Sequence, residues 1–219
     1  MVNLYFIRHG KTEWNLESRY QGAGGDSPLL PESYEEMAQL ASHLAPIEFE
    51  HAYASPIKRA RITAETIVKQ LDQNIPLSLL SRLEEFNLGK MEGQLFTEVA
   101  QQFPKEFDDF RNHPERYDPH QKIGGESFPE LIARMTPAIE QIVAAASPDA
   151  NILIVSHGAA LNAEINSLLG VPLADLRKRG GIANTSTTVL QTNGNGHYEL
   201  VKWNDTSYLQ RQLTDSDTI

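Results

Sequence analysis

Two short apolar segments of the chain each end at a histidine that is followed by glycine. Residues 2–7 (VNLYFI) lead into RHG, and residues 151–155 (NILIV) lead into SHG. Short, nearly continuous apolar runs rich in β-branched or aromatic residues are typical of buried central strands. We therefore predict two neighbouring parallel strands whose carboxyl ends each carry a histidine.

Apolar residues also recur at helical spacing in three other places. Spacings of three and four residues predict amphipathic helices around residues 37–44, 57–71 and 128–143. Ser55 suits the N-cap of the second helix and Pro56 suits its first position, so we predict that this helix begins there.

The alternation of strands and helices predicts the fold class. A short strand is expected at residues 76–80, and two β-rich stretches within residues 182–203 are joined by NGNG, a strong hairpin signal. We predict an α/β fold with a doubly wound, mostly parallel central sheet, helices on both faces and an antiparallel hairpin at one edge.

Two segments depart from this rhythm. Residues 94–125, rich in phenylalanine and proline, are predicted to be a helical insertion, a lid over the end of the sheet where the active site is expected. Residues 204–219 are polar, and we predict a loosely held tail. The length favours one domain over residues 1–219.

The composition of the chain argues against some classes of binding partner and of chemistry. The 219 residues include 29 Asp and Glu against 19 Lys and Arg, a formal net charge of −10, and no cysteine. An acidic protein without a basic run repels nucleic acid and anionic membranes. Disulfides and cysteine nucleophiles are excluded. Since the first residues lack the features of a signal peptide, we expect a cytoplasmic protein; a homodimer is left open.

Cationic and imidazole side chains are predicted to meet at the ends of the central strands. Ligands bind beyond the carboxyl ends of the strands in such sheets, and Arg8, His9 and His157 lie there. Arg59 falls in the first turn of the second helix, where the helix dipole favours a bound anion. Two arginines and two histidines in an acidic protein suit a phosphate dianion, which matches the planar fork of arginine.

Phosphate chemistry gives these residues complementary roles. A neutral imidazole at His9 is a competent nucleophile toward phosphorus, and the leaving oxygen then needs a proton. Glu84, Glu85 and Glu92 are the carboxyl candidates for that proton, and spacing alone does not choose among them. A catalytic metal is not expected, because metal-binding motifs are missing and the arginines would repel a cation.

Five segments resemble motifs of one family, in that family's order. LYFIRHGKTEWN resembles the opening motif of the histidine phosphatase superfamily, the phosphoglycerate mutase-like family, and ASPIKRARITAET resembles its second motif. RLEEFNLGKMEG is similar to its acid-bearing loop, IVSHGAAL to its second histidine motif and WNDTSYL to its typical ending. The resemblance spans essentially the whole chain and is nearest to the short, broad-specificity phosphatase branch.

The resemblance implies a role for each matching residue. It makes His9 the phosphoryl acceptor and selects Glu85 as the acid that protonates the leaving alcohol and then activates water. It implies neither a metal nor an organic cofactor. The residues that it places around the phosphate or on the substrate side are Arg8, Asn15, Gln21, Gly22, Arg59, His157 and Gly158.

The sequence departs from the family pattern at two places, which bear on the assignment of a subfamily. Lys11 stands where glutamate is common, and residues 28–36 replace the usual threonine and glycine turn; we expect neither to touch the core chemistry. Mutases of the family carry a longer insertion with an aromatic and basic segment, for which residues 94–125 show no counterpart. The implied function is a phosphatase acting on a small phosphorylated metabolite. The alternatives are a phosphoglycerate mutase-type transferase and a non-catalytic phosphoester-binding module.

Overall fold

A six-stranded mixed sheet forms the centre of the computed structural model, which describes residues 1–218. The strand order is β3-β2-β4-β1-β5-β6; the first four strands are parallel, and β5 and β6 are antiparallel. Both predicted central strands and the edge hairpin are confirmed. The bounds are β1 Val2–Arg8, β2 His51–Ala54, β3 Leu77–Leu79, β4 Asn151–Ser156, β5 Thr187–Thr192 and β6 Tyr198–Asp205.

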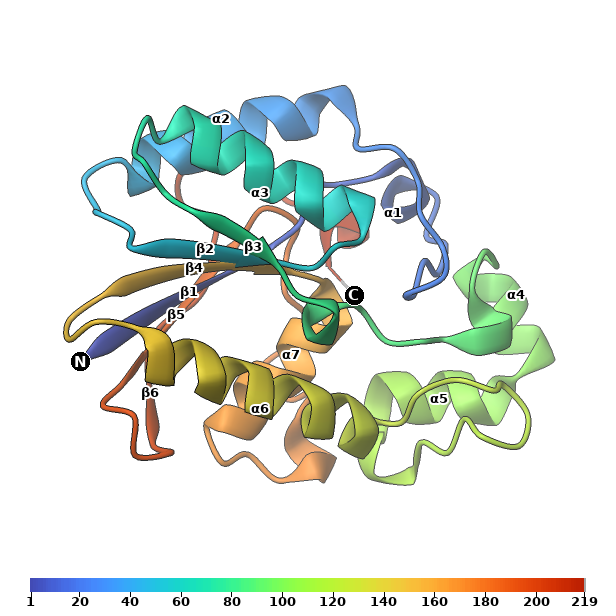
Figure 1. Cartoon of the computed structure of the whole chain (residues 1–219). Helices are drawn as coiled ribbons and strands as arrows, with labels where there is room; N and C mark the ends of the chain where they lie inside the picture. The colour runs from blue at the N-terminus through green and yellow to red at the C-terminus, as the bar shows by residue number, and fades with distance from the viewer. Residues whose placement is uncertain (219) are drawn as a thin grey trace.

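Helices cover both faces of this sheet, which confirms the predicted fold class. In Figure 1, α2 and α3 lie on one face and α6 and α7 on the other. Within the described residues, no helix combines the length and the apolar character that a membrane crossing requires. The bounds are α1 Glu13–Leu16, α2 Pro31–Leu44, α3 Lys58–Gln70, α4 Phe96–Gln102, α5 Pro104–Asn112, α6 Phe128–Ala145 and α7 Gly158–Leu168.

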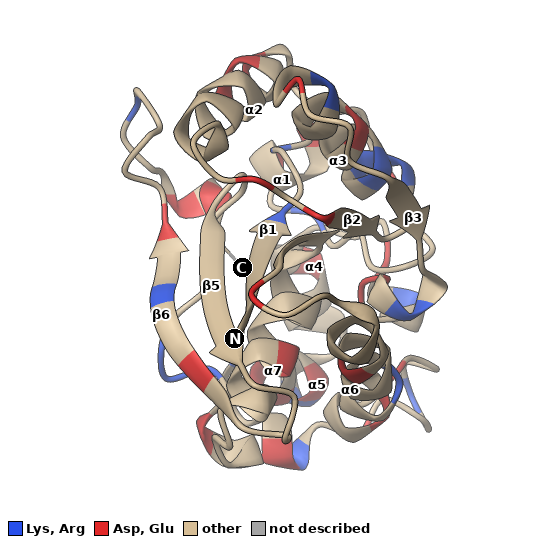
Figure 2. Cartoon of the chain, turned by 60° about the vertical axis from the view of Figure 1, so that its left-hand side comes forward, with Lys and Arg blue, Asp and Glu red and all other residues tan. Residues whose placement is uncertain are grey.

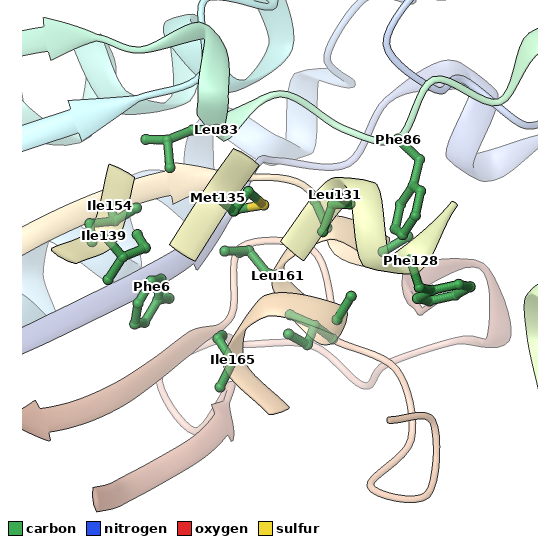
Figure 3. Packing of buried hydrophobic residues seen from close by; sticks show 14 of the residues in the cluster. Phe6, Leu83, Phe86, Phe128, Leu131, Met135, Ile139, Ile154, Leu161 and Ile165 are labelled. Atoms are coloured by element: carbon green, nitrogen blue, oxygen red, sulfur yellow. The ribbon is translucent and has the colours of Figure 1, made fainter. Parts of the chain in front are cut away.

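Alternating side chains of the central strands supply two cores. Phe6 and Ile154 point toward α6 and α7, where Figure 3 shows them among Ile139, Leu161 and other buried side chains. The intervening residues of the same strands pack against α2 and α3 in a second buried cluster. Successive residues of a strand face opposite sides of the sheet, so one apolar run contributes side chains to the core on each face. Packing on both faces fixes the positions of the strand ends.

The predicted start of α3 is wrong by two residues. The helix begins at Lys58 with Ile57 as its cap, so Pro56 precedes the helix. The Ser55 hydroxyl accepts the Ile57 N–H at 3.3 Å and also lies 2.8 Å from Nε2 of His157. Ser55 therefore serves the loop and a histidine instead of capping the helix.

The prediction of a loosely held tail over residues 204–219 is also wrong for its described part; residue 219 lies outside the described residues. The side chain of Asp217 is fully buried. Its carboxylate accepts hydrogen bonds from Lys11 at 3.0 Å and from Arg211 at 2.7 and 2.8 Å. The buried Asp217 therefore anchors a segment whose other polar residues, such as Gln212 and Asp215, are largely exposed.

The insertion is helical and lies beside the carboxyl ends of the parallel strands. Figure 1 shows α4 and α5 at that end of the sheet. Tyr20, from the loop after α1, packs against it with ring centroids 4.4 Å from Phe96 and 6.1 Å from Phe110. The aromatic residues of this segment therefore form a continuous wall next to the strand ends.

Candidate active site

A small pocket opens where β1 and β4 end. It brings together six of the residues predicted from the sequence: His9, Asn15, Gln21, Gly22, Arg59 and Glu85. Sequence reasoning missed the rest of its lining, which consists of Arg19, Tyr20, Leu88, Phe110 and Ala159. Only the aromatic content of residues 94–125 hinted at Phe110, since nothing local shows which phenylalanine faces the strand ends.

His9 is buried and neutral, with a defined tautomer. Its Nδ1 lies 2.7 Å from the Gly10 carbonyl, and a carbonyl only accepts, so Nδ1 carries the proton. Burial lowers the pKa of His9 well below its ordinary value, and the charges of Arg59 and Arg8 lower it further. The lone pair is therefore on Nε2, the atom that faces the pocket's arginine.

Arg59 is held beside that nitrogen by the loop between α1 and α2. Its Nε lies 3.3 Å from Nε2 of His9, and Nη2 donates to the Gly22 carbonyl at 2.8 Å. Nη1 donates to the Gly25 carbonyl at 2.8 Å and to Asp26 at 3.3 Å. Gly22 has φ +62°, a left-handed conformation that suits glycine. This turn aims a carbonyl at the guanidinium.

Arg8 lies behind the pocket with part of its guanidinium unpartnered. Nη1 donates to the carbonyls of Ile182 at 2.6 Å and Asp217 at 2.7 Å. Nε and Nη2 are buried and have no partner within residues 1–218. A Cβ on Gly158 would lie 2.8 Å from Nε of Arg8, so glycine there allows the first residue of α7 to approach the guanidinium closely.

His157 completes the imidazole pair. Its ring centroid is 5.2 Å from that of His9, and its Nε2 lies 2.8 Å from the Ser55 hydroxyl. Burial lowers its pKa well below the ordinary value, with further lowering from Arg59. Nδ1 is buried and unpartnered in the described part of the chain. The strand-end placement predicted from the two apolar runs is therefore confirmed.

Of the three candidate carboxyl groups, Glu85 is the one that lines the pocket. Its Oε1 accepts the N–H groups of Phe86 at 2.9 Å and Ala160 at 2.8 Å, and its Oε2 accepts that of Ala159 at 3.1 Å. The last two belong to the first turn of α7, where backbone donors lack intrahelical partners. Glu92 does not line the pocket; its Oε1 accepts the N–H groups of Leu88 and Gly24.

Asn15 and Gln21 stiffen the loop that carries His9. The Asn15 side-chain oxygen accepts from the backbone and hydroxyl of Thr12, and Asn184 donates both to that oxygen and to the His9 carbonyl. Gln21 donates to the same Thr12 hydroxyl at 2.9 Å. This network orders the pocket floor independently of any ligand.

The charge distribution suits an anion at this site. Figure 2 shows Lys and Arg interspersed with Asp and Glu along the chain. Two arginines nevertheless converge on His9 inside a protein of net charge −10. Among residues 1–218, no three His, Asp or Glu side chains are grouped closely enough to hold a metal ion.

The two buried histidines predict acid sensitivity. Unfolded histidine takes up a proton near pH 6.5, whereas the folded protein holds both rings neutral well below that pH, so the unfolded state binds more protons. The free energy of unfolding should therefore fall as pH drops from 7 to 5.5, by up to about 1.4 kcal/mol per pH unit for each ring. Urea denaturation at both pH values measures this slope. His157→Gln should reduce this pH dependence of the free energy of unfolding, whereas His197→Gln, at an exposed position, should not. The same pH dependence in both variants would contradict the conclusion that His157 is held neutral by burial.

The chain resembles known proteins over most of its length. The family model for the histidine phosphatase superfamily (branch 1) matches residues 4–206. A relative from Escherichia coli O1:K1, named probable phosphoglycerate mutase GpmB, is 32% identical over 176 residues, which cover 78% of this chain and 77% of the relative.

Solved structures show the same fold. Bacillus stearothermophilus YhfR is 32% identical, with a TM-score of 0.87 over 95% of this chain and 99% of YhfR. The mycobacterial glucosyl-3-phosphoglycerate phosphatase Rv2419c, solved with VO3, is 27% identical, with a TM-score of 0.81 over 93% of this chain and 99% of that one. Together with the family model, these matches settle the family: the chain belongs to the histidine phosphatase superfamily.

Proposed function

We propose that the chain hydrolyses phosphomonoesters of small metabolites through a phosphohistidine at His9. One observation carries the proposal: the lone pair on Nε2 of a neutral His9 faces the pocket that Arg59 and Glu85 also line. Nucleophile, cation and carboxyl group are thus within reach of one phosphoryl group. The pairing of phosphatase and mutase names among the relatives agrees with this shared chemistry.

The surrounding residues hold the phosphate in this proposal. Arg8 offers its unpartnered Nε and Nη2, and His157 its unpartnered Nδ1, to the phosphoryl oxygens. Arg59 offers its Nε, which lies 3.3 Å from Nε2 of His9, while the Gly22 and Gly25 carbonyls hold the rest of its guanidinium in place. The remaining predicted residues, Asn15, Gln21, Gly22 and Gly158, shape the cradle around these groups.

Each chemical step conserves atoms and charge. Nε2 of His9 forms a bond to phosphorus while the ester P–O bond breaks, and the leaving oxygen takes the proton of the Glu85 carboxylic acid. The Glu85 carboxylate then removes a proton from water as the water oxygen attacks phosphorus. The P–N bond breaks, its electron pair returns to His9, and phosphate is released.

We favour hydrolysis over transfer because the mycobacterial structural neighbour Rv2419c is named a phosphatase. The deciding experiment supplies purified protein with p-nitrophenyl phosphate and, separately, with 3-phosphoglycerate, in the presence of a chelator. We expect free phosphate from the first and, where the second reacts, free phosphate without isomerised acid. Isomerisation without phosphate release would establish a mutase, and binding without turnover would establish a non-catalytic module.

A further inference from the structure

The loop before β5 lies against the backbone of His9. Because β5 runs antiparallel to β1, with Thr187 opposite Ile7, the residues that precede β5 are next to those that follow β1. Asn184 Nδ2 donates to the His9 carbonyl at 3.0 Å, and the Thr185 N–H donates to the same oxygen at 3.4 Å. The main chain of His9 is thereby held from the β5 side.

The neighbouring backbone groups have partners on other elements. The His9 N–H donates to the Ser156 carbonyl of β4 at 3.0 Å, and the Gly10 N–H donates to the Thr63 hydroxyl of α3 at 3.1 Å. The Gly10 carbonyl accepts from Nδ1 of the His9 ring at 2.7 Å. The direction of the ring therefore follows from the main chain at residues 9 and 10, and the loop before β5 supplies the contacts to the His9 carbonyl.

Thr185 adopts a backbone conformation that its residue type disfavours. Within residues 1–218, five non-glycine residues have a positive φ, and Thr185, at +57°, is the one that is both β-branched and buried. The left-handed region crowds a branched Cβ, so this conformation costs free energy. Two contacts hold it: Thr185 Oγ1 donates to Glu36 at 3.1 Å, and the Tyr208 hydroxyl donates to the Thr185 carbonyl at 2.6 Å. The Thr185 N–H then also donates to the Arg8 carbonyl at 3.1 Å.

Asn184 adds a second local destabilisation at the same place. It is fully buried, and its Oδ1 has no hydrogen-bond partner in the described chain. The His9 carbonyl and the Asn15 side-chain oxygen, 3.3 Å away, only accept, so the amide nitrogen must face them. A buried polar atom without a partner destabilises a fold. Two adjacent residues thus reduce stability where they contact the nucleophile, which is typical of a functional constraint.

We propose that Asn184 and Thr185 are positioning residues, which hold the His9 main chain so that Nε2 points along the line of attack on phosphorus. This inference rests on the proposed function, in which His9 is the nucleophile. The two donors act on the peptide and not on the phosphoryl group. They therefore affect the rate of bond formation to phosphorus and leave phosphate binding to the arginines and the second histidine. A misplacement of about 1 Å slows an aligned displacement by about a hundredfold.

Asn184→Ala tests the side-chain donor. We expect kcat for p-nitrophenyl phosphate to fall by about a hundredfold, while the inhibition constant for inorganic phosphate stays within about twofold of the wild type. Asn162→Ala is the matched control, because Asn162 is also fully buried with an unpartnered Oδ1, and its Nδ2 donates to the Gly180 carbonyl at 2.7 Å instead of to the nucleophile. It should lose stability and keep kcat within about twofold. Equal kcat in the two variants, or a rise in the inhibition constant of Asn184→Ala that matches its loss of kcat, would overturn the proposal.

A pair of variants at Thr185 isolates the backbone conformation. Thr185→Gly and Thr185→Ala both lose the hydrogen bond from the hydroxyl to Glu36, but only glycine adopts a positive φ without strain. We expect kcat per folded molecule to be at least about tenfold higher in the glycine variant than in the alanine variant, a difference that a merely structural role would not produce. Equal values would refute the role of Thr185, and this pair decides if Asn184→Ala does not fold. Failure of the proposed function would look different, as p-nitrophenyl phosphate hydrolysis that does not need His9.

Discussion

Replacing His9 with alanine should reduce kcat for p-nitrophenyl phosphate by about four orders of magnitude, because the variant lacks the nitrogen that receives the phosphoryl group. Arg8, Arg59 and His157 remain, so inorganic phosphate should still bind. The side chain is buried beside two cations, and its loss leaves the strand core intact. Initial rates measured with saturating substrate give the ratio directly.

The covalent intermediate provides an independent measurement of the same residue. Wild-type protein quenched during turnover of a 32P-labelled substrate should carry a label that is stable to base and labile to acid, as a phosphoramidate is. His9→Ala should carry none. His197→Ala, at an exposed position in the β5–β6 turn region, should match the wild type in rate and labelling. More than about 1% of the wild-type rate in His9→Ala would refute the nucleophile assignment.

Replacing Asp217 with asparagine should lower the free energy of unfolding by about 3 kcal/mol, because it leaves the partly buried charges of Lys11 and Arg211 without their shared carboxylate. Arg211 also pairs with Glu36 at 2.5 Å, and Glu36 accepts from Thr185 at 3.1 Å. The network therefore ties the end of the chain to α2 and to the loop before β5. Chemical denaturation near pH 7 measures the loss.

The same segment should also affect phosphate binding, because the Asp217 carbonyl accepts from Nη1 of Arg8. Ending the chain after Leu213 removes that acceptor, and the inhibition constant for inorganic phosphate should rise by about tenfold, equivalent to one charge-assisted hydrogen bond. Asp215→Asn, two residues away and exposed, is the matched control and should change neither quantity. An unchanged inhibition constant in the shortened chain would show that Ile182 alone positions Arg8.

This network also explains the departure at position 11. Lysine stands there, and its ammonium group donates to Asp217 at 3.0 Å and to Ser216 at 2.7 Å. Lys11 does not line the pocket, but it holds Asp217, whose carbonyl accepts from Arg8. The influence is indirect, through position and not through contact with the phosphoryl group.

Local sequence determined the elements of this fold and most of the chemistry at its centre. The runs VNLYFI and NILIV predict buried strands because nearly all of their residues are apolar and can be covered on either face, and both strands formed where expected. Since parallel strands end at the same edge, the histidine after each run had to lie near the other, and the two rings are 5.2 Å apart. Periodicity is a short-range property, so it can be read from residues that are neighbours in the chain.

Only the tertiary structure decided which distant groups meet. Serine is a residue type that favours helix N-caps, yet the Ser55 hydroxyl forms a hydrogen bond with His157, which is 102 positions away. Asp217 belongs to a polar stretch typical of a tail, yet it is buried by Lys11 and Arg211. Arg111 and Arg177 look like ordinary surface charges until α5 and the loop after α7 pack around Phe110. In each case the free energy comes from pairing or burying a polar group, and that depends on partners that no local pattern specifies.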